Sequence, residues 1–210
     1  MKDIRINKDI VNLITKSVLA GVVIALAGLI YLKTTDKTVG AFLFSLGLCS
    51  VLVLQANLYT GKCGYINSWE SLWQAFIMLV FNLAAAYLVG LICRGIYGTS
   101  IAMASRLAKT WYEIFFDGIG CGACIYLSVE LYKRTKSFVP VILGVMAFIL
   151  AGFEHCVADA MYLGFSKPTG LGFAYVLLVA VGNSIGSLII RGIQIAIFKE
   201  ESSSEIQQNT

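Results

Sequence analysis

The stretch Gly152-Phe153-Glu154-His155-Cys156-Val157-Ala158-Asp159 places an acid, the only histidine of the chain and a second acid inside a long apolar segment. A plain membrane-spanning helix stays apolar over about 20 residues. Ionisable groups at membrane depth are costly, and they are tolerated mainly where they face a pathway or a protein interior. The stretch therefore predicts a broken helix whose polar residues face away from lipid.

The composition of the rest of the chain agrees with a membrane protein. Of 210 residues, 58% are apolar and 13% are charged, and the net charge is +4. An ordinary soluble domain is about a quarter charged. The composition thus disfavours a soluble enzyme and a disordered chain, and we expect neither catalysis nor a cofactor or metal. The basic residues lie mainly in loops, so no nucleic-acid partner is expected.

Six long apolar segments follow one another along the chain. Because lipid cannot satisfy an open backbone, all six are expected to be transmembrane helices of one all-α domain over residues 1–199. Residues 200–210 form a polar C-terminal tail. The charged N-terminus lacks the pattern of a cleavable signal peptide. The segments cover about 17–32, 39–58, 72–92, 114–132, 138–162 and 172–190.

The second and fifth segments are irregular in the same way. The second ends in Gln55-Ala56-Asn57-Leu58-Tyr59-Thr60-Gly61-Lys62, and the fifth ends in the stretch quoted above. Each is followed by a segment with one asparagine, Asn82 or Asn183. Three segments followed by three more, with the middle one interrupted each time, predict an inverted 3+3 repeat around a central site. The repeats would cover about 10–98 and 106–199.

Lysine and arginine counts predict the orientation. The side that holds both termini would carry ten of these residues and the other side six. Because cytoplasmic loops carry the excess of positive charge, both termini are expected in the cytoplasm of a multi-pass cell-membrane protein.

His155 is the strongest candidate for a role in a pathway; the alternative is a satisfied structural histidine. A buried imidazole can donate a hydrogen bond or a proton to a passing anion. Glu154 points about 100° away from His155 on a regular helix, so we expect it to brace backbone donors at the break, with a proton relay as the alternative. Asp159 would share the face of His155 if the helix were continuous.

Five further polar residues each have a functional and an ordinary interpretation. Thr60 suits a tight buried loop or an interfacial turn. Asn82 and Asn183 are either glue between helices or support for the broken segments. Arg106 and Lys109 are either solvated loop charges or a cationic funnel for anions.

The chain resembles the formate/nitrite transporter family, which includes formate, nitrite and hydrosulfide channels. Three stretches carry the resemblance, which covers nearly the whole chain: Gly152 to His155 with Ala158, the run 45–48 leading to 58–60, and 182–186. The resemblance implies an aquaporin-like six-helix protomer, a homopentamer, one pore per protomer and the passage of small monovalent anions.

The resemblance also implies site residues. His155 would be the central pore histidine, which binds or protonates the anion. Thr60 would belong to the mobile loop and Asn183 to the sixth helix, and the lysine before the fourth helix falls on either Arg106 or Lys109. The apolar constriction would be formed by Phe44, Leu48, Leu58 and Phe148.

The chain departs from the family pattern at three positions. The family commonly has Ser and Asn where this chain has Cys156 and Asp159, and Asn in place of Gly122. An extra acid near the pore could alter anion preference or proton coupling.

Two other classes of function are alternatives for this sequence. The first is a six-helix substrate-binding subunit of a multi-component vitamin transporter. The second is an intramembrane thiol oxidoreductase that uses Cys121 and Cys124, although these cysteines lack the βαβ context of that motif. Most of the six cysteines lie in apolar segments, so no disulfide framework is expected.

Overall fold

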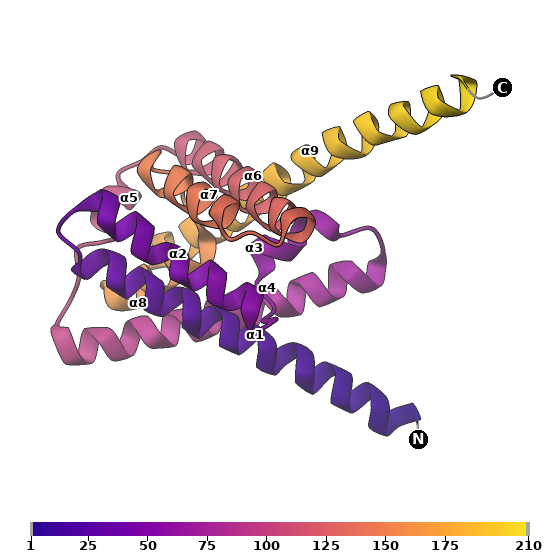
Figure 1. Ribbon diagram of the computed structural model, residues 1–210. Helices are drawn as coiled ribbons and strands as arrows, with labels where there is room; N and C mark the ends of the chain where they lie inside the picture. Colours follow the sequence, from indigo (N-terminus) through magenta and orange to yellow (C-terminus); the bar gives the residue numbers. More distant parts are fainter. Residues whose placement is uncertain (1, 209–210) are drawn as a thin grey trace.

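The computed structural model describes the backbone of residues 2–208 and the side chains of residues 8–198. Within that range every regular element is a helix, which confirms the all-α prediction (Figure 1). The elements are α1 (Lys2–Lys33), α2 (Lys37–Val53), α3 (Tyr59–Lys62), the 3-10 turn η1 (Cys63–Tyr65), α4 (Trp69–Tyr97), α5 (Ala104–Leu107), α6 (Trp111–Thr135), α7 (Val139–Leu150), α8 (Cys156–Phe165) and α9 (Gly170–Gln208).

Four of these helices are long and apolar enough to cross a membrane. They contain the spans Lys8–Lys33, Trp69–Tyr97, Trp111–Thr135 and Gly170–Phe198. The other two predicted segments are divided, one into α2 and α3 and the other into α7 and α8. The interruptions fall where the polar stretches predicted them.

The outward faces of the long helices carry large apolar side chains. Such a surface would be unusual on a soluble monomer and suits contact with lipid or with another subunit. Examples with more than half of the side chain exposed are Leu46, Leu88, Ile92, Ile96, Phe116 and Leu177.

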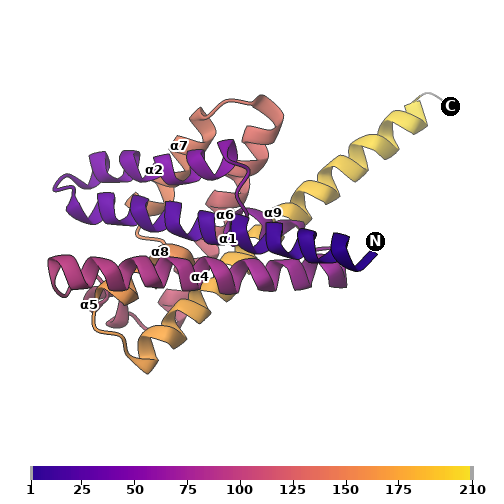
Figure 2. The ribbon, with the colours of Figure 1, turned by 90° about the horizontal axis from the view of Figure 1, so that it is seen from below.

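The two halves of the chain pack in the same order. Helix α1 packs against α4 and α2, and α6 packs against α9 and α7 in the same way. Helix α1 runs toward the end of the bundle that holds α5, whereas α6 begins at that end and runs away from it (Figures 1 and 2). The halves are therefore inverted, as the sequence predicts.

The two helix breaks also correspond in backbone geometry. At the first break Gln55 has a φ of 51°, and at the second Gly152 has a φ of 78°. Three residues later the chain is extended, at Leu58 with a φ of −91° and at His155 with a φ of −116°, before the next helix begins. A left-handed residue followed by an extended one turns the backbone away from the helix axis. In this way each break aims one residue toward the centre of the bundle.

Asn82 on α4 holds the first break in place. Its side-chain oxygen accepts the backbone N–H of Tyr59 at 2.7 Å. Its amide nitrogen donates to the carbonyl oxygens of Ser17 at 2.7 Å and Asn57 at 2.9 Å. Backbone groups freed by an interruption need partners inside a membrane protein, and this side chain serves two of them, on Tyr59 and Asn57. Its third bond, to Ser17, ties the break to α1.

Asn183 on α9 does the same at the second break. Its oxygen accepts the backbone N–H of Cys156 at 3.1 Å. Its nitrogen donates to the carbonyl oxygens of Gly118 at 2.8 Å and Glu154 at 2.9 Å. Both asparagines are fully buried, so of the two interpretations of Asn82 and Asn183 the geometry favours support of the broken segments.

The close approach of α6 to α9 accounts for the glycine at position 122. A Cβ atom on Gly122 would overlap the carbonyl oxygen of Asn183, just as a Cβ on Gly21 would overlap that of Asn82. Only glycine lets two backbones approach so closely. The asparagine that the resemblance expects at this position does not fit this packing.

The ends of α1 and α9 project from the same end of the bundle, opposite α5 (Figures 1 and 2). Helix α9 continues to Gln208, so most of the segment expected as a polar tail is a helical extension. The final two positions of that tail, 209–210, lie outside the described residues.

Candidate functional site

A cavity of about 310 Å³ opens at the α5 end of the bundle. We call it the vestibule cavity. It is bounded by the divided α7–α8 segment, by α2, and by α5 with the loop that follows it. Its principal lining side chains are Tyr31, Lys37, Phe44, Arg106, Lys109, Phe148, Glu154, His155, Asp159 and Tyr162.

A second cavity, of about 200 Å³, lies toward the end that holds the termini. We call it the termini-side cavity. Its walls are mostly apolar, with two lysines among them. It is lined by Leu48, Val51, Leu52, Gln55, Ala56, Leu58, Gly61, Lys62, Val129 and Lys133.

The four apolar residues predicted to form a constriction divide between these cavities. Phe44 and Phe148 line the vestibule cavity, and their ring centroids lie 6.0 Å apart with nearly perpendicular planes. Leu48 and Leu58 line the termini-side cavity and are 1% exposed. All four are buried.

His155 lies beside one of these apolar side chains, Phe148. Its ring stacks on Phe148 with centroids 5.9 Å apart, and the residue is buried against the vestibule cavity. Its Nε2 lies 2.9 Å from the Oγ1 of Thr60, a buried residue on α3 that lines neither cavity described above. The hydrogen bond joins the two interrupted segments.

The other ring nitrogen of His155 defines its protonation state. His155 is the N-cap of α8, and its Nδ1 accepts the backbone N–H of Ala158 at 3.3 Å. A nitrogen that accepts a hydrogen bond carries no proton, so the ring is neutral and its proton sits on Nε2. The positive end of the α8 dipole also disfavours an imidazolium at this position. His155 therefore donates its Nε2 proton to Thr60.

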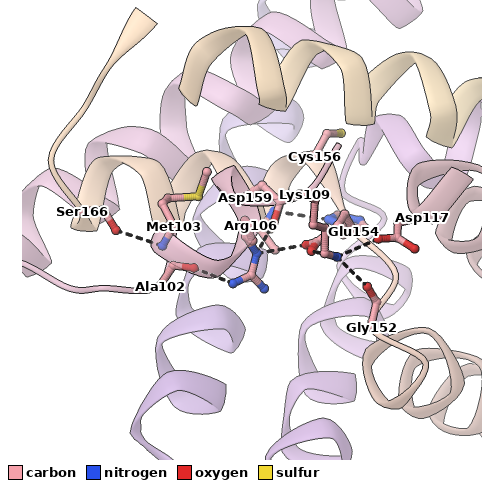
Figure 3. A network of polar contacts seen from close by, with 12 residues as sticks. Ala102, Met103, Arg106, Lys109, Asp117, Gly152, Glu154, Cys156, Asp159 and Ser166 are labelled. Carbon is pink, nitrogen blue, oxygen red and sulfur yellow. Dashed lines mark hydrogen bonds and ion pairs between the residues drawn. The ribbon is translucent and has the colours of Figure 1, made fainter. Parts of the chain in front are cut away.

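Arg106 and Lys109 reach the same carboxylate from two sides (Figure 3). The Nε of Arg106 lies 2.9 Å from Oε2 of Glu154 and 3.2 Å from Oδ1 of Asp159. The Nζ of Lys109 lies 2.6 Å from Oε1 of Glu154 and 2.7 Å from Oδ2 of Asp117. Both basic residues thus line the vestibule cavity, but each is paired with two acids.

Glu154 differs from its predicted role. Its side chain was expected to bond backbone donors at the break, and instead it binds the two cations. Its backbone carbonyl, not its carboxylate, takes part in holding the break, by accepting from Asn183. The sequence could not show this because the cations are 48 and 45 residues away in the chain.

The surroundings of Lys109 keep it charged. Burial lowers the pKa of the Lys109 ammonium, but the hydrogen bonds and charges of Asp117 and Glu154 outweigh this effect and raise it above its usual value. Lys109 also donates to the carbonyl oxygen of Gly152 at 3.2 Å. It therefore clamps the second break to α6.

Sequence reasoning missed some residues of the vestibule cavity. Lys37, at the start of α2, lines it and makes no ion pair with any side chain that the structure describes. Tyr162 lies under the Arg106 guanidinium, 4.5 Å from Cζ to the ring centroid. In the sequence, Lys37 is one of the six basic residues expected on the side opposite the termini, and only this position could have pointed to it. Cys121 and Cys124 are free thiols.

The fold combines helices suited to a membrane with two interrupted segments and a cavity toward each end of the bundle, which is the arrangement of a membrane channel or transporter. The model of the formate/nitrite transporter family matches residues 2–197, and the chain belongs to that family.

Known members of the family are similar over most of the chain. A probable formate transporter of Methanothermobacter thermautotrophicus is 26% identical, with 85% of each chain covered. The formate channel FocA of Haemophilus influenzae is 26% identical, covering 72% of this chain and 64% of that protein. A solved structure described as a pentameric formate channel with formate bound shares the fold, with a TM-score of 0.77 at 17% identity over 91% of this chain and 98% of that one.

Proposed function

We propose that the chain is a pore for small monovalent anions of the formate, nitrite or hydrosulfide class. The observation that carries the proposal is the arrangement of two cavities, one toward each end, lined by the buried Phe44 and Phe148 on one side and Leu48 and Leu58 on the other, with a single buried imidazole beside Phe148. Relatives described as formate transporters and channels support the same class of substrate.

These four apolar side chains and His155 have opposite effects on an anion. Phe44, Phe148, Leu48 and Leu58 force the anion to lose water, which is costly for a bare charge. The Nε2–H of His155 offsets part of that cost by donating a hydrogen bond. Because this proton is already directed at the Thr60 hydroxyl, Thr60 would hold the imidazole in the donor state until an anion takes its place.

The remaining predicted site residues take supporting roles in this proposal. Asn183, expected in the pore, would act through the backbone of the second break, as Asn82 does at the first. Arg106 and Lys109 would shape the mouth with Glu154 and Asp159 and not serve as free positive charges.

The membrane arrangement is proposed from weaker signals. Two divided and four continuous helices would make six spans. The charge bias of the loops places both termini in the cytoplasm. The pentameric neighbour supports a homopentamer in a cell membrane.

Flux through proteoliposomes tests the function. Purified wild-type chain should carry formate, nitrite or hydrosulfide without any partner protein, whereas a substrate-capture subunit would show no flux by itself. His155→Ala and His155→Phe should change that flux, while Gly192→Ala, at a position with nothing within 4 Å of a new Cβ, should not. Unchanged flux of all three anions in both histidine variants would defeat the role assigned to His155.

A further inference from the structure

Asp159 is a buried acid in the wall of the vestibule cavity with one oxygen that lacks a partner. It lies on the first turn of α8, lines the cavity and is 1% exposed. Its Oδ1 shares the Nε proton of Arg106 with Glu154. Its Oδ2 is one of two buried side-chain atoms, among the described side chains, that have no hydrogen-bond partner; the other is the hydroxyl of Tyr175.

The carboxyls of Glu154 and Asp159 meet at one donor, because the Nε of Arg106 lies 2.9 Å from Oε2 of Glu154 and 3.2 Å from Oδ1 of Asp159. Two carboxylates held on one cation repel each other when both are ionised, and such pairs can keep one proton between them. Both oxygens of Glu154 already accept from cations, Oε1 from Lys109 and Oε2 from Arg106. Glu154 is therefore the ionised member, and Asp159 is the member with an oxygen free to carry a proton.

The charges around the pair lead to the same assignment. When every group is ionised, Arg106 and Lys109 face three acids, Asp117, Glu154 and Asp159, which leaves one uncompensated negative charge. An uncompensated buried charge is costly, and one proton on the pair makes the cluster neutral.

Apart from the exposed Lys37, the other titratable groups around Asp159 supply no further positive charge. The His155 ring is neutral, because its Nδ1 accepts a backbone N–H. The remaining ones are the thiols and phenols of Cys121 on α6, Cys156 and Tyr162 on α8, and Tyr175 on α9. The exposed Lys37 and the half-buried Tyr31 line the same cavity from α2 and α1.

We propose that Glu154 and Asp159 together hold one proton at the wall of the vestibule cavity, and that losing this proton makes the wall repel anions. The proton goes to water in the cavity as the pH rises, and the cluster changes from neutral to a charge of −1. The claim that losing the proton repels anions rests on the proposed function. The claim that the pair holds a proton does not depend on it.

Infrared difference spectroscopy tests the proton directly. In the purified protein at neutral pH, the carbonyl stretch of a protonated carboxylic acid should be present, should shift in D₂O and should disappear in Asp159→Asn. Glu70→Gln, which removes an exposed acid outside the cluster, is the control and should keep the band. Absence of the band in the wild type, or its persistence in Asp159→Asn, would overturn the proposal.

The ratio of anion flux in Asp159→Asn to that in the wild type tests whether loss of the proton makes the cavity wall repel anions. Asn has the shape of a protonated Asp and cannot lose its proton. Taking the ratio at each pH cancels the bulk protonation of the anion. The ratio should be near one at acid pH and rise roughly tenfold at alkaline pH, as expected for a unit charge about 10 Å from the anion at an effective dielectric constant of about 20.

The failures of the two proposals can be told apart. A flat flux ratio overturns the control of transport by the pair, even if the infrared band behaves as expected. If no variant carries any anion, the proposed function fails, and the infrared band still decides whether the pair holds a proton.

Discussion

The Nε2 of His155 lies 2.9 Å from the Oγ1 of Thr60, so the two interrupted segments, 95 residues apart in the chain, meet at one buried hydrogen bond. Both residues come from helix breaks held by equivalent asparagines. The position of the imidazole therefore depends on both halves of the protein.

Thr60→Val tests this bond, because it keeps the shape of the side chain and removes the hydroxyl. A buried Nε2–H without an acceptor should cost about 1–3 kcal/mol of stability. Thermal unfolding in detergent should show the loss. Anion flux should also fall several-fold, because the ring loses its fixed orientation. Thr60→Ser, which keeps the hydroxyl, should remain close to the wild type; equal losses in both variants would argue against the hydrogen bond.

Asn82→Ala and Asn183→Ala should destabilise the protein to a similar degree. Each removes the partner of two buried backbone groups at a break, and each orphaned group costs about 1–3 kcal/mol. The two losses together should cost about 2–6 kcal/mol in each variant, measured by denaturant unfolding in detergent. If Asn183 bound the anion and did little for the backbone, Asn183→Ala would lose flux while its stability stayed near that of the wild type.

Gly122→Ala should destabilise the packing of α6 against α9. In an open helix the same change stabilises by about 0.5–1 kcal/mol, because glycine is poor in helices. Here the new Cβ meets the carbonyl oxygen of Asn183. Gly192→Ala, on α9 with open space around it, is the control and should be neutral or stabilising. The unfolding midpoint of Gly122→Ala should be lower than that of the wild type; an equal or higher midpoint would contradict the close packing.

The contribution of Lys109 to stability should disappear only in strong alkali. Its pKa in the folded protein is raised above the usual 10.5, so its stabilising effect is fully present below that value and is lost as the pH rises through the folded pKa. The difference in unfolding midpoint between the wild type and Lys109→Gln should stay constant near neutral pH and shrink above about pH 10.5.

Lys37→Gln is the control for that experiment. Lys37 lines the same cavity, is exposed and pairs with no described acid. The difference in unfolding midpoint between the wild type and Lys37→Gln should therefore not change as the pH rises above about 10.5. If the difference in unfolding midpoint between the wild type and Lys109→Gln grew with pH, a stabilising role for the pairing of Lys109 with Asp117 and Glu154 would be contradicted.

Much of the fold could be predicted because lipid imposes strong rules on the sequence. Long apolar segments must be helices, and polar interruptions at the same place in each half indicate an inverted repeat. The interruptions at 55–62 and 152–159 were located by this reasoning. The exact helix ends were not, and α9 continues to Gln208, because a polar helical extension has no apolar pattern to reveal it.

The site was predicted only in part. The sequence identified the solitary histidine, the two asparagines and the two basic residues before α6. It did not reveal that Glu154 lies between those basic residues, or that both amide N–H groups of Asn183 are bonded to backbone carbonyls and leave none to donate to an anion.

The class of protein, the places where two helices break and the single imidazole at one break could be predicted from the order of the residues. Which charges neutralise one another, and that the neutral ring of His155 donates to Thr60, became visible only in the folded chain. The difference lies in the distance along the chain over which each effect acts. The preference of each residue for lipid or water is local, whereas a hydrogen bond or ion pair between residues 45 to 95 positions apart exists only after the helices have packed.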